Sequence, residues 1–195
     1  MAKRSISRAD ILPMDVYGTE RRARRHAVAE LKRNRRVHVG PYATFYFESY
    51  DTMWHQVHEM LFIEKGGEAQ IEEELAAYNP LIPQGDELVA TVMFEIEDPA
   101  RRAAELGRLG GVEHVMSISV DGTAVKGVSE DDTERTNAAG KASSVQFVHF
   151  PLGPALSAKF KRPGAKVVVS IEHPSYAHMA GMPEAVRAAL AADLD

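Results

Sequence analysis

Residues 47–83 constrain the fold most, because they contain the start and stop signals of two short helices that follow each other directly. Apolar side chains at helical spacing run over 52–65, with Asp51 as the expected N-cap. Gly66-Gly67 ends this helix, and Asn79-Pro80 ends a second, acidic helix over 68–78. The sequence therefore predicts a helical hairpin in the N-terminal half of the chain.

A long basic helix and a β-hairpin precede this pair. The pattern over 15–36 predicts a helix with small apolar residues on one side. The opposite, basic side is expected to carry Arg21, Arg25, Lys32 and Arg36. Residues 37–48 predict a hairpin that turns at Gly40-Pro41 and places Ala43, Phe45 and Phe47 on one side.

The second half of the chain changes to alternating apolar and polar residues. The expected strands are 88–97, 112–120, 123–128, 145–150 and 165–172; the expected helices are 99–109, 153–161 and one that Pro183 opens. We expect an α+β fold, with the N-terminal helices and a hairpin packed on a mixed, mostly antiparallel sheet of about five strands with β-α-β units. The length predicts a single domain over 1–195, with a mainly helical part over 1–83 and a sheet part over 84–195.

Composition excludes several classes of site. The chain has no cysteine, so it forms no disulfide, zinc–thiolate site or cysteine-ligated cluster. Its start is basic but no apolar segment follows, and no run is long enough to span a membrane, so we expect a cytoplasmic protein. P-loop, dinucleotide-binding and nucleophile-elbow motifs are absent from the sequence.

Charge is distributed unevenly along the chain. Residues 20–36 carry eight Lys or Arg against two Glu, a net +6, so the other residues carry −11 of the total of −5. A basic helix on an acidic body offers a docking face for an acidic partner. The sequence disfavours nucleic acid as a partner because aromatic residues are not interleaved with the arginines.

Helix 52–65 carries the first candidate group for chemistry. His55, His58 and Glu59 lie one turn apart on its polar side, where they could hold a divalent metal, transfer protons, or form an ordinary solvated face. Glu64 falls on the apolar side, so it is expected either in a buried ion pair with Arg24, Arg35 or Arg36, or as an active-site carboxylate. Glu48 is a candidate for the same network.

A second candidate group follows the strand 165–172. His173, Tyr176 and His178 are expected on a loop over 173–178, and His149 ends another strand. The histidines are candidate ligands of a divalent metal or of an anion, while a hydrogen-bonded turn accounts for the same residues.

Several short sequence motifs give the chain a resemblance to a known family. They include Arg35-Arg36-Val37, Phe47-Glu48, Glu59-Met60-Leu61, Tyr78-Asn79-Pro80-Leu81-Ile82-Pro83 and His173-Pro174. With them the chain resembles an uncharacterised bacterial family, known as a domain of unknown function, whose members are often encoded near rubrerythrin-like and heterodisulfide-reductase-like iron–sulfur proteins. The binding candidates within or near these motifs are Arg36, Glu48, Gln56, Glu59, Glu64 and Tyr176.

The resemblance implies a role in redox or oxidative-stress metabolism. Together with the missing catalytic motifs, it favours an accessory or binding protein that acts with rubrerythrin-like or iron–sulfur redox partners. The alternative is a metal-dependent enzyme that uses helix 52–65 or loop 173–178. The sequence leaves the ligand, the metal and homo-oligomer formation open.

Overall fold

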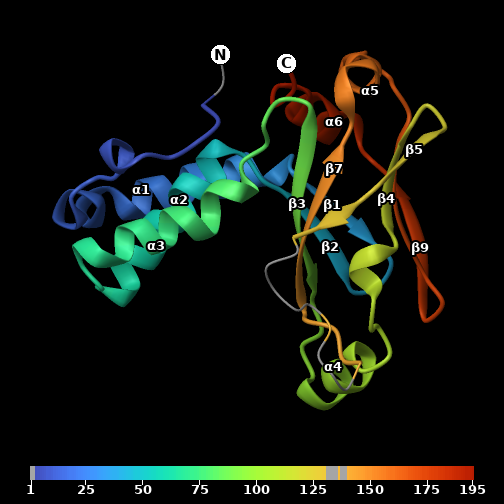
Figure 1. The fold of residues 1–195 in the computed structure, drawn as a ribbon, viewed down its shortest axis with the longest axis horizontal. Helices are drawn as coiled ribbons and strands as arrows, with labels where there is room; N and C mark the ends of the chain where they lie inside the picture. Colours follow the sequence, from blue (N-terminus) through green and yellow to red (C-terminus); the bar gives the residue numbers. More distant parts are fainter. Residues whose placement is uncertain (1–2, 131–135, 137–139) are drawn as a thin grey trace.

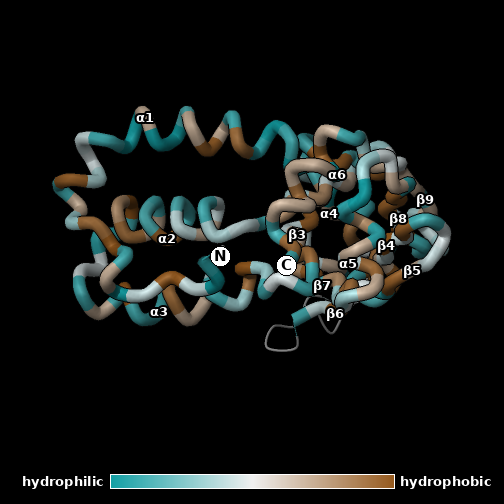
Figure 2. Tube along the Cα trace, turned by 90° about the horizontal axis from the view of Figure 1, so that it is seen from above, coloured by the Kyte–Doolittle hydropathy of each residue, from teal (hydrophilic) through white to brown (hydrophobic). Residues whose placement is uncertain are grey.

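Helices from the N-terminal half form an arm that projects from the rest of the molecule (Figure 1). In this computed structural model, which describes residues 3–130, 136 and 140–195, the arm consists of α1 (Met14–Arg33), α2 (Tyr50–Glu64) and α3 (Glu68–Tyr78). α2 lies between the other two (Figure 2). The predicted helical pair is confirmed, and α1 ends at Arg33 rather than at residue 36.

Local hydrogen bonds explain where α2 begins and ends. Ser49, rather than the expected Asp51, is the N-cap: its hydroxyl accepts from the Thr52 amide, and Thr52 accepts from the Ser49 amide in return. Lys65, at φ 56°, closes the helix in the left-handed region. Short 3-10 turns flank the arm at Arg8–Asp10 and Asn79–Leu81, and a third lies at Val112–His114.

The strands form two sheets, so the α+β class is confirmed, but the single sheet of about five strands is replaced by two. The five-stranded sheet has the order β1-β2-β3-β7-β6: Arg36–Val39, Ala43–Phe47, Glu87–Phe94, Val145–Pro151 and Val128–Ser129. The four-stranded sheet has the order β5-β4-β8-β9: Thr123–Lys126, Met116–Val120, Val167–His173 and Tyr176–Gly181. Every strand pair in the described residues is antiparallel, so the expected β-α-β units do not give parallel strands.

β9 is the strand that the sequence analysis missed. It forms a hairpin with β8, so the expected loop over 173–178 is a turn at Pro174 and Ser175 that leads directly into a strand. β9 lies at the edge of its sheet and most of its residues are exposed, so it lacks the apolar alternation that marks the other strands. The polar, mostly acidic segment 129–141 is also expected to form a loop from its sequence, and its residues 131–135 and 137–139 lie outside the described residues.

Gly127 lets one extended segment serve both sheets. β5 and β6 follow each other with only this residue between them, yet β5 pairs in one sheet and β6 in the other. A Cβ atom at Gly127 would lie 2.5 Å from Val148 Cγ1 and 3.0 Å from Phe150 Cε1. Glycine is therefore required where the chain crosses between the sheets over the core.

β3 joins the arm to the sheets because its alternating side chains pack into two different cores. Leu88, Ala90, Val92 and Phe94 face the core between the sheets. Val89, from the opposite face, packs in the arm's core with Val57, Leu75 and other side chains. The hairpin β1–β2 belongs to the same sheet as β3, so the expected division at residue 83 separates neighbouring strands.

Three shorter helices complete the body. α4 (Pro99–Leu106) lies at one end, and α5 (Gly153–Lys161) and α6 (Glu184–Ala191) lie at the other, near the chain termini (Figure 1). Phe160, Val186 and Leu190 from α5 and α6 are buried in the core between the sheets. Among the described helices, none combines the length and apolar character needed to cross a membrane.

The crossing at Gly127 gives a stability prediction. Gly127→Ala forces the new methyl group against Val148 and Phe150 in a packed core, and we expect a loss of about 1–3 kcal/mol in the free energy of unfolding. Gly181→Ala is the matched control, because no atom lies within 4 Å of its Cβ position, and its effect should stay within about 0.5 kcal/mol. Urea denaturation of both variants measures the difference, and equal midpoints would contradict the role given to Gly127.

Candidate functional site

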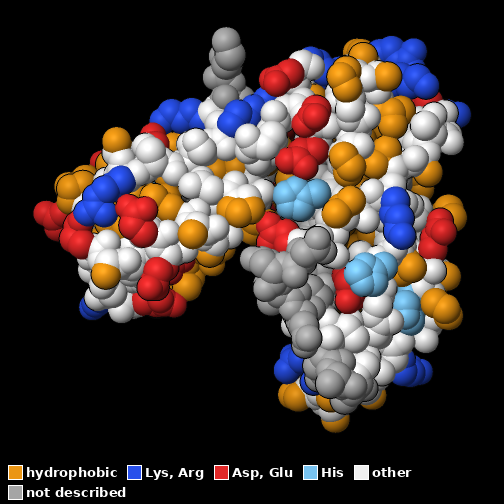
Figure 3. Space-filling view, in the orientation of Figure 1, with side chains coloured by type: hydrophobic (Ala, Val, Ile, Leu, Met, Phe, Trp, Pro, Cys, Tyr) orange, Lys and Arg blue, Asp and Glu red, His pale blue; other side chains and the backbone are white. Residues whose placement is uncertain are grey.

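A hollow of about 240 Å³ lies where the arm meets the five-stranded sheet. The space-filling view shows that the surface is concave between arm and body (Figure 3). Its apolar walls come from Met53, Leu81, Met93, Val145 and Phe147. Polar groups come from Lys32 of α1, Gln56 of α2, Thr91 of β3 and Glu48, which directly follows β2, together with the phenols of Tyr46 and Tyr78.

Glu48 is the buried acid of this hollow. It follows the last residue of β2 and is only 5% exposed. Thr52 donates its hydroxyl to one carboxylate oxygen at 2.6 Å, and Thr91 donates to the other at 2.7 Å. No ion pair to this carboxylate is found among the described residues. A carboxylate has about four acceptor positions, so Glu48 retains capacity for a further donor.

Gln56 and Tyr78 form the helical side of the hollow. The Gln56 side chain hydrogen-bonds the Tyr78 hydroxyl, while burial raises the pKa of Tyr78 above its ordinary value. Tyr78 is therefore a neutral phenol at physiological pH. Of the binding candidates, Glu48 and Gln56 are brought together here, and Lys32 adds a cation that sequence analysis had assigned only to an outward basic face.

Arg35 fixes the backbone beside Glu48. Its buried guanidinium donates to the carbonyl oxygens of Phe47 at 3.0 Å and Glu48 at 2.7 Å, and it pairs with Asp193 near the C-terminus. Arg36, the arginine taken as a binding candidate, is exposed on β1 and does not line the hollow.

Glu59 braces α1 against α2 instead of forming a solvated pair. Arg21 donates to both carboxylate oxygens at 2.8 and 2.9 Å, and Tyr17 donates its hydroxyl at 2.7 Å. The Arg21 hydrogen bond lowers the pKa of Glu59 to about 2. Arg21 therefore faces α2 rather than solvent, and the expected apolar stripe of α1 at Ala23 and Ala27 is exposed.

His58 is buried, which corrects its expected place on the polar side of α2. Its Nε2 accepts from the Leu12 amide at 3.0 Å, so Nδ1 carries the hydrogen that it donates to the Trp54 carbonyl at 2.7 Å. Desolvation lowers the pKa of His58. Both ring nitrogens are thus engaged in holding the N-terminal segment to the arm, and they are not free for a metal.

The buried ion pair expected for Glu64 is wrong. Glu64 is exposed in the last turn of α2, and its contact is with Gln70, which donates to it at 2.7 Å. Gln70 also donates to Glu74 at 2.8 Å. Because the chain turns away at Lys65, the end of the apolar stripe meets solvent rather than the sheet.

The histidine candidates do not form one site. His173 accepts from the Ser175 amide through Nδ1 and contacts the Gly110 carbonyl through Nε2. His178 is exposed and packs edge-on against Tyr176, whereas His149 bridges Glu87 and Glu130. Within the described part of the chain, no group of three His, Asp or Glu side chains is arranged to hold a metal ion.

Tyr176 has a structural role. Its hydroxyl accepts from the amides of Tyr42 and Ala43 and donates to the Val39 carbonyl, each at 2.8–2.9 Å. These three bonds hold the β1–β2 turn against β9 and use the full capacity of the hydroxyl. Tyr176 therefore has nothing left to offer a ligand.

Comparison with known proteins adds the family. A model described as a protein of unknown function (DUF3501) matches residues 5–194. The chain belongs to the DUF3501 family. A crystal structure described as a novel protein of unknown function from Burkholderia pseudomallei is 38% identical and superimposes with a TM-score of 0.90. The match covers 98% of this chain and 100% of the other, so the two share the whole DUF3501 architecture. No curated protein matches.

The DUF3501 hollow includes residues that sequence reasoning missed. Thr91 and Met93 alternate on β3 with the residues that face the core between the sheets, so they lie on the opposite face. The pairing of Phe47 with Ala90 then brings Thr91 next to Glu48. The alternation signal was present, but nothing local in the sequence showed that the second face of the strand is covered by the arm.

The Arg21–Glu59 brace predicts a change in acid stability. Glu59→Gln should lower the free energy of unfolding by about 1–3 kcal/mol at neutral pH, since it leaves a partly buried guanidinium without its counter-charge. Because the pKa of Glu59 is lowered in the folded protein, its ionised carboxylate stabilises the fold at pH values above the ordinary pKa of 4.5. This stabilisation is lost as the pH falls toward about 2, so the stabilities of wild type and variant should converge over that range.

Glu20→Gln is the control for this measurement. Glu20 pairs with Arg24 on the same helix in an exposed position, and the substitution should change stability by less than about 0.5 kcal/mol. Denaturation midpoints for the three proteins at several pH values test the prediction. A constant gap between wild type and Glu59→Gln from pH 7 to 2 would contradict it.

Proposed function

We propose that this protein is a non-catalytic binding protein whose ligand is a small zwitterion with an apolar body, held in the hollow between arm and sheet. One observation carries the proposal: the Glu48 carboxylate is buried beside an apolar hollow and its contacts are two neutral hydroxyl groups. A buried carboxylate is costly without compensating donors. An ammonium group from a ligand supplies such donors together with the missing positive charge.

The rest of the hollow fits the other parts of this ligand. Lys32 provides a cation for an acidic group, and the side chains of Met53, Leu81 and Phe147 provide apolar walls. A volume of about 240 Å³ suits a molecule of amino-acid size rather than a nucleotide. An amino acid with an apolar side chain combines the three features.

A binding role is favoured over metal-dependent catalysis. The acid–base groups first considered, His58 and Glu59, are engaged in fixing the N-terminal segment and α1. None of the residues that line the hollow is a histidine. Its polar groups can orient a ligand, but no nucleophile and general base stand paired among them.

We further propose that the protein acts in the cytoplasm, as a single domain, beside rubrerythrin-like or iron–sulfur proteins in redox or oxidative-stress metabolism. The support for this cellular role is the family resemblance carried by the Arg35-Arg36-Val37 and Tyr78-Asn79-Pro80 motifs. Measuring binding between the purified protein and a purified rubrerythrin-like protein from the same cell tests it, and lack of binding at micromolar concentrations counts against this setting.

Three probes of similar shape test the ligand chemistry. Phenylalanine carries both charges, phenethylamine only the positive one and phenylpropanoate only the negative one. In NMR titrations of the labelled protein, phenylalanine should bind most tightly and shift amide signals around the hollow. Glu48→Gln should weaken phenylalanine and phenethylamine by about tenfold or more and leave phenylpropanoate nearly unchanged, because a hydrogen bond to a charged group contributes about 1.5–3 kcal/mol.

A second variant separates binding from folding. Met93 lines the hollow and is 36% exposed, so Met93→Trp should fill the opening and abolish binding without unfolding the protein. Met179→Trp, at a residue 73% exposed on β9, is the matched control and should bind like wild type. Equal affinity of all three probes, or unchanged binding in the Met93 variant, would reject the proposed site.

A further inference from the structure

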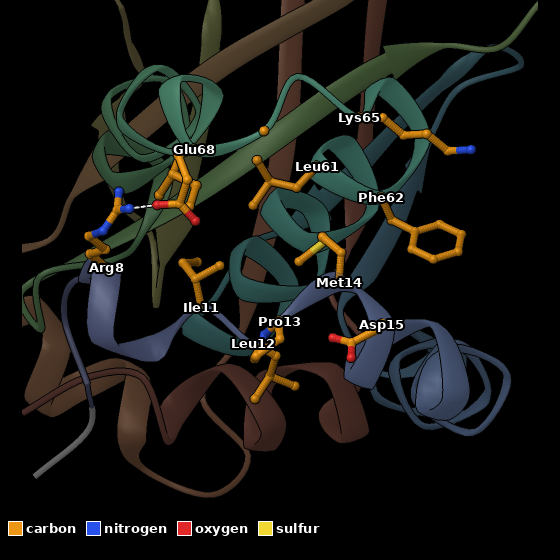
Figure 4. A pocket seen from close by; sticks show the side chains of 12 residues that line it. Arg8, Ile11, Leu12, Pro13, Met14, Asp15, Leu61, Phe62, Lys65 and Glu68 are labelled. Atoms are coloured by element: carbon orange, nitrogen blue, oxygen red, sulfur yellow. Dashed lines mark ion pairs between the residues drawn. The ribbon is translucent and has the colours of Figure 1, made fainter.

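A second and larger hollow opens at the tip of the arm, away from the sheets (Figure 4). Its volume is about 670 Å³, and it lies between the segment before α1, the end of α2 and the start of α3. The walls are mainly apolar, with Ile11, Leu12, Met14, Leu61, Phe62 and Ile71. Ile63, in the same turn of α2, is 60% exposed, so apolar surface continues beyond the hollow.

The charges around this hollow are partly balanced. Arg8 pairs with Glu68 and Glu72 across one side, as the dashed line in Figure 4 marks for Glu68. Lys65 and Asp15 lie on the other side and offset each other in sign. This hollow by itself therefore fits apolar groups rather than a particular charge.

A basic groove adjoins the apolar hollow and shares Phe62 with it. The groove has a volume of about 470 Å³ and is lined by Gly18, Arg21, Arg22, Arg25, His26 and Phe62. Gly18 allows the close approach, because a Cβ atom there would lie 3.0 Å from the Phe62 ring. The Arg21 guanidinium lies over the same ring, 4.9 Å from its centre.

The groove keeps two uncompensated cations. Glu59 neutralises Arg21, but Arg22 and Arg25 are exposed and form no ion pair among the described residues. The chain as a whole is acidic, at −5, so this concentration of positive charge is local. Local unpaired charge steers a partner of opposite sign to one place on the surface.

We propose that the arm tip is a docking surface for an acidic, amphipathic segment of a partner protein. Apolar side chains of that segment enter the hollow beside Met14 and Leu61, and its carboxylates pair with Arg22 and Arg25 on the other side of Phe62. Charge complementarity selects the partner, and the contiguous apolar surface supplies the contact area. The apolar hollow and the basic groove both open onto the surface of the arm. This suits a peptide chain lying across them better than an enclosed small molecule.

A synthetic peptide tests the proposal. The probe is a fluorescent peptide of about ten residues that alternates glutamate with leucine and phenylalanine, and its binding is followed by fluorescence anisotropy. The Arg22→Glu, Arg25→Glu double variant should bind at least about tenfold more weakly, and wild-type affinity should fall with rising salt. Met14→Gln should also weaken binding, because it places an amide in the apolar hollow.

Matched controls make the outcome decisive. Arg33→Glu with Arg36→Glu changes the net charge equally, at the last residue of α1 and the first of β1, and should change affinity less than about twofold. A peptide with lysine in place of glutamate should not bind. The proposal is overturned if the two double variants lose affinity equally, or if Met14→Gln leaves the affinity for the peptide unchanged.

These measurements are independent of the arm–sheet hollow. The Met93→Trp protein, in which that hollow is filled, should still bind the acidic peptide with wild-type affinity. A loss of peptide binding in that variant would contradict separate sites. Failure of the amino-acid probes would leave the docking surface standing.

Discussion

The buried guanidinium of Arg35 is the contact on which the placement of the arm depends. It lies where α1 gives way to β1, and it reaches the carbonyls that end β2 and the carboxylate of Asp193 close to the C-terminus. Burial raises the pKa of Asp193, and Arg35 opposes that shift. Removing one member of such a pair leaves a buried charge unpaired, which is far more costly than an exposed pair would be. Arg4 adds to this junction by donating to the carbonyls of Pro83 and Asp193.

The arm itself is held together by polar contacts as much as by apolar ones. α1 packs on α2 through Tyr17, Arg21 and Glu59, and the N-terminal segment is fixed by His58 and by Trp54, which donates to the Asp10 carbonyl. These contacts have strict geometry, so they orient the helices more specifically than a stripe of alanines could. Apolar side chains of α1 that would form an ordinary helix interface are left on the outside.

Features with a local cause were predictable from the sequence, and features that depend on distant segments were not. Glycine and proline residues predict the ends of α2 and α3 and the turn of the β1–β2 hairpin, since each of them acts on the backbone within a few residues. The two-sheet arrangement depends on a crossing at Gly127, whose reason is contact with Val148 and Phe150 rather than any turn motif. β9 was missed because an exposed edge strand has no buried face to impose alternation.

The candidate site shows the same division. Glu48 and Gln56, both candidates from the sequence, line the same hollow, but the side chains opposite them, Thr91 and Met93, lie on the second face of β3, and nothing in the local sequence shows that the arm covers this face. His58 was placed on a solvated face because the helical pattern does not reveal that residues 6–12 return across it. Glu64 was placed inside because periodicity was extended into the last turn, where the chain leaves the core.

α2 runs from the base of the arm to its tip. Met53 and Gln56 stand at its base and Leu61 and Phe62 near its tip, which are about 9–12 Å apart along a helix that rises 1.5 Å per residue. The arm–sheet hollow and the hollow at the arm tip therefore share this helix but are lined by different residues. A substitution at either end of α2 can thus alter one hollow while the lining of the other is unchanged.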